Sequence, residues 1–558
     1  MMKLVTAAAL ALTLPTVILG RSEAQTRGPS QTPAERSMVG SSPSKTVGER
    51  VLKSVLPGVV EASRLLAARQ TTSEALVQQA LTRITVLDDF GPQLHAIIAL
   101  NPHALADARK LDAERKAGKV RGPLHGVPIL LKDNIESWDD TATTAGSLAL
   151  KDNVPARDAP LVHRLTDAGA VILGKTNLSE WANIRSNHSV SGWSGIGGLV
   201  KNPYALNRSP CGSSAGSGAA AAASLAAGAV GTETDGSITC PASSNGVVGL
   251  KPTVGLVSRT YVVPISHSQD TAGPMTRNVE DAAAMLTAMA GTDPMDAATA
   301  EADAHKTDYL KALSKDALNG IRIGVIRPDY AKGNRLEPVY AASLEKLKAA
   351  GAVLVEVTMP KRDPKMGAQE FTVLMTELKA DLNAYLASTD PRRVKTRTLA
   401  DLIAFNKASP REMVLFGQET FEQAETTKGL DDPDYKAALK GSREGARAML
   451  DKAMADNNVQ ALVAPTTGPA WLIDMVSEDH YSGSQSSLPA ISGYPHLTVP
   501  MGQVVGMPVG LSIIGPAWSE AKLLAFGYAF QEQGARFVPP TYAPSIESKS
   551  GEAFAPSH

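Results

Sequence analysis

The 558-residue chain has the composition of a folded globular protein, with 43% hydrophobic and 20% charged residues. Its 55 Lys and Arg residues nearly balance its 56 Asp and Glu residues, which leaves a formal net charge of -1. This balance argues against a partner held by charge alone, such as nucleic acid or an acidic membrane surface, and favours a small-molecule or peptide substrate.

The N-terminus has the order of a secretory signal peptide. Lys3 precedes an apolar run over 4–19, and polar residues follow over 21–25. A retained anchor is the alternative, although the run is shorter than the roughly 20 apolar residues that span a bilayer. We expect a signal peptide over 1–24, cleaved near Ala24. The mature protein would then be exported, periplasmic or secreted, with no stable membrane insertion.

Three changes of pattern follow in chain order. Residues 25–50 are rich in Ser, Pro and Gly without apolar periodicity, and we expect a flexible leader there. From about 50 to 120 the apolar residues recur at helical spacing. From 128 to about 260 short apolar runs alternate with Gly-rich turns, which indicates strands of a sheet buried on both faces. These runs cover residues 129–131, 170–173 and 247–250.

The second half of the chain continues the α/β pattern. A βαβ-like passage comprises an apolar run over 321–326, a helical stretch over 338–350 and a run over 353–355. Helical patterns dominate from about 368 to 458, and returning strands are predicted at 462–465 and 497–500. We therefore predict one α/β domain over 51–540 and a flexible C-terminal tail over 541–558.

One short motif points to nucleotide binding. Residues 169–176 match the P-loop letter for letter, but the apolar run 170–173 occupies the positions of the loop. Because a phosphate cradle needs a loop there, we do not expect nucleotide binding.

A second motif points to an α/β-hydrolase. Residues 212–216 match the nucleophile elbow, which would make Ser214 the nucleophile. The elbow requires a preceding strand, and two prolines within 201–210 argue against one. An esterase that uses Ser214 remains an alternative, with a triad completed by one of His267, His480 and His496.

Three Gly/Ser-rich or strand-end segments hold residues that can carry chemistry. Lys132 directly follows the apolar run 129–131; such a lysine usually extends outward to solvent. Residues 211–218 open an Ala-rich helix, where they either cap the helix or present free N–H groups to an anion. In residues 232–238, Gly236 lets backbone amides approach a substrate oxygen closely.

These segments resemble the amidase signature family, and within it the bacterial peptide amidases. The resemblance spans about 60–535 and rests on the motifs at 123–128, 132–134, 174–177, 211–218, 231–237, 249–253, 499–502 and 508–511. It implies the amidase signature fold, in which a mixed central β-sheet is sandwiched by α-helices (α/β/α). It also implies an enzyme that needs no metal or organic cofactor.

The resemblance assigns roles to individual residues. It implies Lys132 as the catalytic lysine, Ser213 as the serine with a cis peptide bond, and Ser237 as the nucleophile. Ser213 is preferred to Ser214 because the two serines of the family lie 24 positions apart, as Ser213 and Ser237 do. Ser214 is then expected to support the catalytic residues without taking part in the reaction itself. The implied oxyanion hole consists of the backbone N–H groups of Thr234, Asp235, Gly236 and Ser237.

The chemistry of such a site can be stated independently. A serine hydroxyl is a poor nucleophile until a neighbouring base takes its proton. Lys132 can serve as that base only when neutral, so it should be desolvated and flanked by hydroxyl groups. No cluster of zinc-like spacing occurs among the ten His and two Cys residues, and we expect no metal.

Four residues keep alternatives open. Cys211 and Cys240, each within three residues of a proposed catalytic serine, either form a disulfide or fill tight space as buried thiols. Asn183 is the candidate for a polar substrate contact, or it caps a helix or turn. Asp235 stands where many family members have Gly, a change typical of the peptide amidase branch; it either orders the turn or engages a substrate amine.

The predicted function is a serine amidase that hydrolyses C-terminal amides of peptides or amino-acid amides to the acid and ammonia. An aryl or xenobiotic amidase of the same family is the alternative. An inert binding module is disfavoured because Lys132, Ser213 and Ser237 are all present. The export signal disfavours a role in aminoacyl-tRNA amidation, and the oligomeric state is left open.

Overall fold

The computed structural model describes residues 48, 51 and 54–548. The predicted signal peptide lies outside the described residues, as do most of the predicted leader and residues 549–558. Within the described part, an 11-stranded sheet has the order β1-β3-β2-β6-β8-β7-β12-β13-β11-β9-β10. Parallel pairs, such as β2 with β3 and with β6, occur beside antiparallel pairs, such as β12 with β13, so the sheet is mixed.

The strands of this sheet are β1 (Ile97–Leu100), β2 (Pro128–Lys132), β3 (Val171–Thr176), β6 (Gly228–Glu233), β7 (Val248–Lys251), β8 (Thr271–Thr276), β9 (Arg322–Val325), β10 (Val353–Glu356), β11 (Ala461–Pro465), β12 (His496–Val504) and β13 (Met507–Ile514). A separate short pair consists of β4 (Trp193–Ser194) and β5 (Gly198–Leu199).

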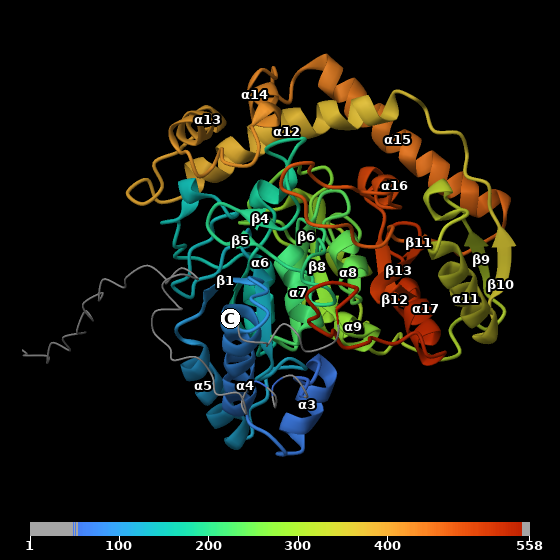
Figure 1. The fold of residues 1–558 in the computed structure, drawn as a ribbon, viewed down its shortest axis with the longest axis horizontal. Helices are drawn as coiled ribbons and strands as arrows, with labels where there is room; N and C mark the ends of the chain where they lie inside the picture. Colours follow the sequence, from blue (N-terminus) through green and yellow to red (C-terminus); the bar gives the residue numbers. More distant parts are fainter. Residues whose placement is uncertain (1–47, 49–50, 52–53, 549–558) are drawn as a thin grey trace, which may run out of the picture.

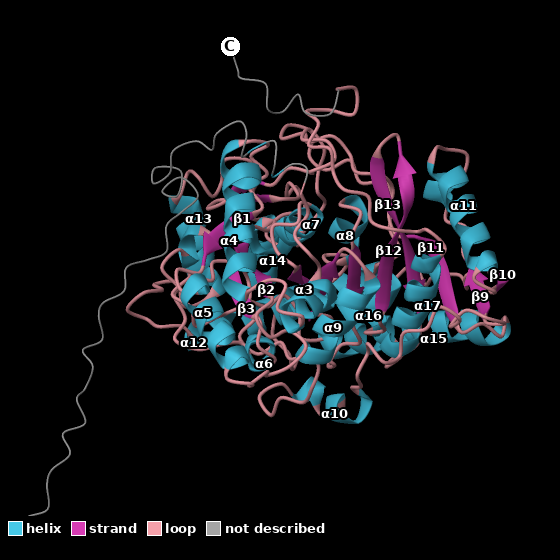
Figure 2. Ribbon diagram, turned by 90° about the horizontal axis from the view of Figure 1, so that it is seen from below, coloured by secondary structure: helices cyan, strands magenta, loops and turns pink. Residues whose placement is uncertain are grey.

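Helices flank the sheet, as the α/β/α prediction expects (Figure 1). They are α3 (Val59–Ala67), α4 (Ser73–Ile84), α5 (Ala104–Lys116), α6 (Pro160–Asp167), α7 (Ala215–Ala222), α8 (Thr239–Ser244), α9 (Val279–Met289), α10 (Ala302–His305), α11 (Leu336–Ala349), α12 (Met366–Ser388), α13 (Leu399–Ala408), α14 (Glu419–Glu425), α15 (Pro433–Asp456), α16 (Ser487–Ser492) and α17 (Glu520–Glu532). Figure 2 shows the strands running through the middle of the molecule with helices around them. No helix in the described part of the chain has the length and apolar character needed to cross a bilayer.

Every apolar run predicted as a strand lies in or overlaps a strand of the sheet, and the predicted helical stretch over 338–350 overlaps α11. The rejection of a P-loop is also confirmed, because residues 171–176 form strand β3. Four strands of the 11-stranded sheet were not predicted, namely β1, β6, β8 and β13, and neither was the short pair of β4 and β5. In β6 the reason is visible at Gly231, where an added Cβ would lie 2.9 Å from the Ser214 hydroxyl. Close packing of α7 on β6 therefore demands small residues, which hide the strand pattern.

The predicted flexible tail begins too early. Tyr542 is only 4% exposed, and its N–H donates to the Pro203 carbonyl at 2.9 Å. The N–H of Leu206 donates to the carbonyl of Ala543, also at 2.9 Å. Residues 541–548 are thus anchored on the domain by one buried aromatic ring and two backbone bonds, which a polar, Pro-rich composition conceals.

The sheet places the candidate site. Strand β2 lies between β3 and β6 and is parallel to both, so the carboxyl ends of the three strands meet at one edge. Ligands of α/β sheets bind at this edge because the loops that leave the strands converge there. Lys132 ends β2, and the turn containing Ser237 follows β6.

Candidate active site

Lys132 is surrounded by hydroxyl groups. Its side chain is fully buried, and Nζ donates to Ser213 Oγ at 2.7 Å and to Thr232 Oγ1 at 2.9 Å. Asn134 Nδ2 donates to the same Thr232 hydroxyl at 3.0 Å. The lysine therefore does not extend to solvent; it points into a polar cluster beneath the serines.

Burial governs the protonation of Lys132. Desolvation lowers the pKa of this amine to about 7, against the carboxylates of Asp270 and Glu233, which raise it. A lysine that titrates near neutrality holds a substantial neutral fraction at pH 7. It can then accept a proton, as a general base must.

Ser213 lies in the loop before α7, and the Gly212–Ser213 peptide bond is cis. The carbonyl of Ser213 accepts the N–H of Ser179 at 3.0 Å, and a Cβ at Gly212 would collide with the Ser179 hydroxyl. The loop is thus packed tightly against Ser179, and the fully buried Ser213 hydroxyl is directed at Lys132.

Ser237 lies in the turn between β6 and α8. The Glu233 carboxylate holds this turn by accepting the N–H groups of Ile238 at 2.8 Å and Thr239 at 2.9 Å. Ser237 is 8% exposed, whereas Lys132 and Ser213 are at 0%. The Ser237 hydroxyl makes no hydrogen bond to another described residue. Of the three, Ser237 is therefore the one that an incoming substrate can reach.

The direct contact in this structure is between Lys132 and Ser213; a hydrogen bond from Ser237 to Ser213 is not formed among the described residues. Catalytic hydrogen bonds are often long in the absence of substrate and tighten in the complex. The N–H of Ser214 donates to the carbonyl of Ser237 at 3.1 Å, so the turn that holds Ser237 lies against the loop that holds Ser213.

The backbone amides proposed for the oxyanion hole have no intramolecular acceptor. The N–H groups of residues 234–237 donate no hydrogen bond to any described residue, although those of 238 and 239 both do. Gly236 has φ +79°, a left-handed conformation that lets the turn reverse there. Four successive unpaired N–H groups beside a serine hydroxyl form a concave donor surface suited to a developing negative charge.

Ser214 has a structural role here. Its hydroxyl donates to the Thr232 carbonyl at 3.0 Å and accepts the Thr232 N–H at 3.2 Å, which fastens the start of α7 to β6. No strand occurs within 201–210, so the elbow geometry is absent. The three histidines that would complete the alternative triad contact other groups: Asp381 for His267, Asp474 for His480 and Ser512 for His496.

A pocket of about 400 Å³ adjoins the turn. It is lined by Asn183, Ser191, Cys211, Gly212, Asp235, Gly236, Cys240, Trp471, Asp479, Tyr481, Ser484, Ser486 and Ser487. Cys211 and Cys240 form a disulfide in its wall, which decides between the two alternatives for these residues. The amide oxygen of Asn183 has no partner among the described residues, so this side chain has a free acceptor at the pocket.

Sequence reasoning found one acid of this pocket, Asp235, and missed the pocket residue Asp479 and Glu370, which acts on Asp235 by charge. Burial raises the pKa of Asp235, although Ser486 and Ser487 hydrogen-bond to it. Burial and repulsion from Asp235 raise the pKa of Glu370 to about 8. Glu370 and the pocket residues Trp471, Asp479 and Tyr481 lie outside all the motifs, so no local signal could identify them.

Comparison with known proteins decides the family. The family described as Amidase matches residues 75–524. The chain belongs to the amidase signature family. The crystal structure of a native peptide amidase from Stenotrophomonas maltophilia is 50% identical to this amidase, with a TM-score of 0.83, and the match covers 87% of this chain and 98% of that chain.

Two further comparisons agree. A structure of the peptide amidase PAM in complex with the competitive inhibitor chymostatin is 51% identical, with a TM-score of 0.84 and the same coverage of both chains. A protein described as a probable amidase of Arabidopsis thaliana is 40% identical over 485 residues, which is 85% of this chain and 89% of the relative. This amidase is therefore an amide-hydrolysing enzyme, and the predicted family and fold are confirmed.

Proposed function

We propose that this amidase hydrolyses C-terminal amides of peptides or amino-acid amides through an acyl-enzyme on Ser237. The observation that carries the proposal is the contact of 2.7 Å from the buried amine of Lys132 to Ser213, beside the accessible Ser237. A base, a hydroxyl relay and a reachable nucleophile are the parts that serine acyl transfer needs.

In the first half-reaction, Ser237 Oγ attacks the carbonyl carbon of the amide. The Ser237 proton passes to Ser213 Oγ as the Ser213 proton passes to neutral Lys132. The carbonyl oxygen becomes an oxyanion that accepts the N–H groups of 234–237; one such donor contributes roughly 3–4 kcal/mol in the transition state. The C–N bond then breaks, and the leaving nitrogen takes a proton back through Ser213 and departs as ammonia.

In the second half-reaction, water attacks the ester carbonyl. Lys132 accepts the water proton through Ser213, the C–O bond to Ser237 breaks, and the proton returns to Ser237 Oγ. The products are the carboxylic acid and free enzyme. The same base and the same amides thus serve both steps.

The substrate class is supported by the pocket and by the similarity to peptide amidases. Serines, Asn183 and two aspartates line most of the pocket, which suits the amide groups of a peptide. The aryl amidase alternative is favoured by one feature: Trp471 and Tyr481 meet edge to face at 5.6 Å and offer an aromatic wall.

We also propose that the protein is exported. The order of charged, apolar and polar residues over 1–25 supports this, and so does the Cys211–Cys240 disulfide, because disulfides persist in oxidising compartments.

The test is ammonia release from a peptide amide and from an aryl acetamide. It compares the wild type with Ser237→Ala, Lys132→Ala and Ser214→Ala, each checked for folding. Turnover of the peptide amide that Ser237→Ala and Lys132→Ala abolish, and that Ser214→Ala only weakens, supports both relay and substrate class. An active Ser237→Ala enzyme contradicts the nucleophile, and preferred turnover of the aryl acetamide contradicts the substrate class.

A further inference from the structure

A second hydrogen-bond network reaches the oxyanion turn from outside the catalytic residues. Thr234 Oγ1 donates to Asp270 Oδ1 at 2.6 Å. The other carboxylate oxygen of Asp270 accepts the N–H groups of Ile265 at 2.8 Å and Ser266 at 2.9 Å. Asp270 thus closes the segment 265–270 into a tight loop and ties that loop to the first residue of the turn.

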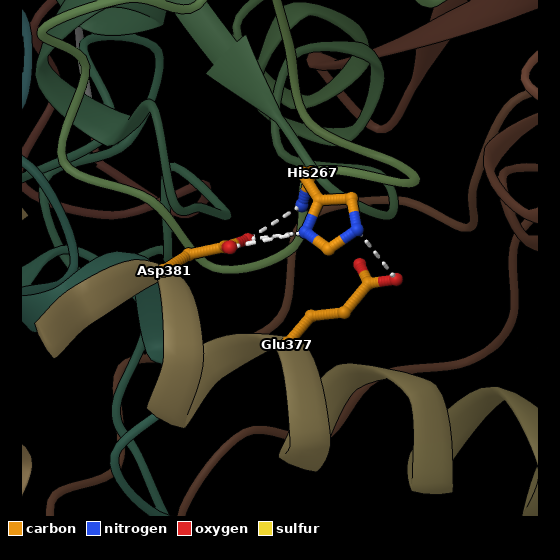
Figure 3. Close-up of side chains that lie close together, drawn as sticks. All are labelled: His267, Glu377 and Asp381. Atoms are coloured by element: carbon orange, nitrogen blue, oxygen red, sulfur yellow. Dashed lines mark hydrogen bonds and ion pairs between the residues drawn. The ribbon is translucent and has the colours of Figure 1, made fainter. Parts of the chain in front are cut away.

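The other side of the 265–270 segment is fastened to α12. The N–H of His267 donates to Asp381 at 2.9 Å, and the imidazole Nδ1 lies 2.8 Å from the same carboxylate. His267 Nε2 lies 3.3 Å from Glu377, so the ring bridges two carboxylates of one helix (Figure 3). The hydroxyls of Ser266 and Ser268 both donate to Glu377.

The cluster of His267, Glu377 and Asp381 has the residue types of a metal site, but its geometry fits an ion-paired bridge better. Each ring nitrogen faces a different carboxylate, whereas one ion bound by both carboxylates would take a single ring nitrogen. The Glu377 oxygens already accept the Ser266 and Ser268 hydroxyls, the Ser268 N–H and the Tyr435 hydroxyl.

We propose that Asp270 is a positioning residue for the oxyanion hole, and that α12 holds Asp270 in place through His267 and Glu377. The proposal rests on the proposed function of the 234–237 amides. Those amides have no acceptor among the described residues, so their direction is set by the bonds that fix the rest of the turn. In its second half the Gly236 carbonyl accepts the Cys240 N–H at 2.8 Å, and the Ser237 carbonyl accepts the Ser214 N–H at 3.1 Å.

The two ends are fixed differently. Beyond Ser237, the Glu233 carboxylate holds the N–H groups of 238 and 239. At Thr234, the Asp270 bond of 2.6 Å is joined only by a long contact of 3.4 Å from Gln269 to the Thr234 carbonyl. Loss of Asp270 therefore releases the start of the turn, and the N–H groups of Thr234 and Asp235 turn away from the oxyanion.

Asp270 also acts on the base by charge. Asp270 and Glu233 are the carboxylates that raise the pKa of Lys132 against desolvation. Replacing Asp270 with a neutral residue lowers that pKa further, so Lys132 stays neutral to lower pH. A purely structural defect would not move the acid limb of the pH profile in this way.

The experiment measures kcat, KM and the pH profile of amide hydrolysis for Asp270→Asn and Thr234→Val. The matched control is Asp281→Asn. Asp281 also accepts a backbone N–H, that of Val60, and burial raises the pKa of both Asp270 and Asp281 to about 6. We expect kcat to fall roughly 10- to 100-fold in both site variants, in line with loss of oxyanion stabilisation, while KM changes less than threefold. Asp281→Asn should lower only the Tm.

The pH profiles separate the two roles of Asp270. In Asp270→Asn the acid limb should move to lower pH, whereas in Thr234→Val, which keeps the carboxylate, it should stay at the wild-type position. If both variants keep the wild-type kcat, the positioning role is overturned. If Asp270→Asn fails to fold, Thr234→Val alone decides between the two results.

Two further controls complete the test. An inactive wild type, or an active Ser237→Ala variant, would overturn the proposed function and not the positioning role. Titration of the wild type and of His267→Gln with Zn²⁺ tests the bridge: we expect no binding difference between them, and stoichiometric binding lost in His267→Gln would replace the bridge by a metal site.

Discussion

Lys132 and Lys175 occupy nearly equivalent places in the fold and contact different chemistry. Lys132 is the last residue of β2 and Lys175 the last but one of β3, the neighbouring parallel strand, and both side chains are fully buried. Lys175 is paired with Leu131, the residue before Lys132. Because successive side chains alternate between the faces of a sheet, the two lysines point to opposite faces.

Their partners explain why we assign catalysis to only one of them. Lys132 meets the Ser213 and Thr232 hydroxyls beside the substrate pocket. Lys175 donates to the Ile135 carbonyl and to Thr143 Oγ1, and the carboxylates of Asp139 and Asp133 raise its pKa against desolvation. Burial lowers the pKa of both amines. Burial alone therefore does not distinguish a general base from a structural cation. The distinguishing feature is a hydroxyl group that lies between the lysine and a nucleophile.

The largest effect should come from replacing each lysine with Met. Lys132→Met removes the proton acceptor, and kcat should fall by roughly 10³-fold or more while the fold persists. Lys175→Met leaves the Ile135 carbonyl and Thr143 without their donor, so it should cost about 1–3 kcal/mol of stability and spare kcat of the folded enzyme. Activity per folded molecule and chemical denaturation check both outcomes. Equal loss of kcat in the two variants would contradict the assignment.

The pH dependence of the wild type tests the state of Lys132. Its pKa is lowered by burial to about 7, and only the neutral amine accepts a proton, so kcat should fall about tenfold per pH unit below that value. Between pH 7 and pH 5 the expected loss is roughly 50-fold, because half of the amine is already protonated at pH 7. Lys175→Met should show the same acid limb. A wild-type profile that is flat from pH 5 to 9 would exclude neutral Lys132 as the base.

The sequence motifs were sufficient to select the proposed catalytic residues and insufficient to find the pocket. Lys132, Ser213 and Ser237 lie in short segments whose neighbours are constrained locally, as at Gly212 and Gly236, so motifs reveal them. Trp471, Asp479 and Tyr481 reach the pocket only through the tertiary packing of an irregular segment. Strand β6 escaped prediction because close approach of α7 requires small residues there, which weakens the periodicity on which strand prediction depends.

A smaller difference in kcat should separate variants of the two threonines whose hydroxyls accept hydrogen bonds from the lysines. Thr232→Val removes the hydroxyl that accepts Lys132 Nζ at 2.9 Å, and Thr143→Val removes the one that accepts Lys175 Nζ at 3.0 Å. We expect kcat to fall about fivefold in Thr232→Val, because the loss of one hydrogen bond, about 1 kcal/mol, frees the amine to leave Ser213. Thr143→Val should keep kcat within about twofold at a similar cost in stability. If Thr143→Val is the slower enzyme, the two lysine environments have been assigned the wrong way round.

The smallest effect concerns Asp133, a buried acid that acts on Lys175 by charge. Burial raises the pKa of Asp133 to about 7, although Lys175 and the Thr144 hydroxyl lower it, and its Oδ1 has no partner among the described residues. A carboxyl whose folded pKa is raised contributes stability that is fully present below the unfolded pKa of about 4 and is lost as the pH rises through about 7.

Asp133→Asn removes this loss of stability. Its Tm relative to the wild type should therefore rise by roughly 2–4 °C between pH 5 and pH 8, and the exposed control Asp152→Asn should show no such rise. A relative Tm that falls instead over this range would mean that ionised Asp133 and protonated Lys175 form a stabilising pair, and the contrast between the two lysines would then lie in their charge state as well as in their hydroxyl partners.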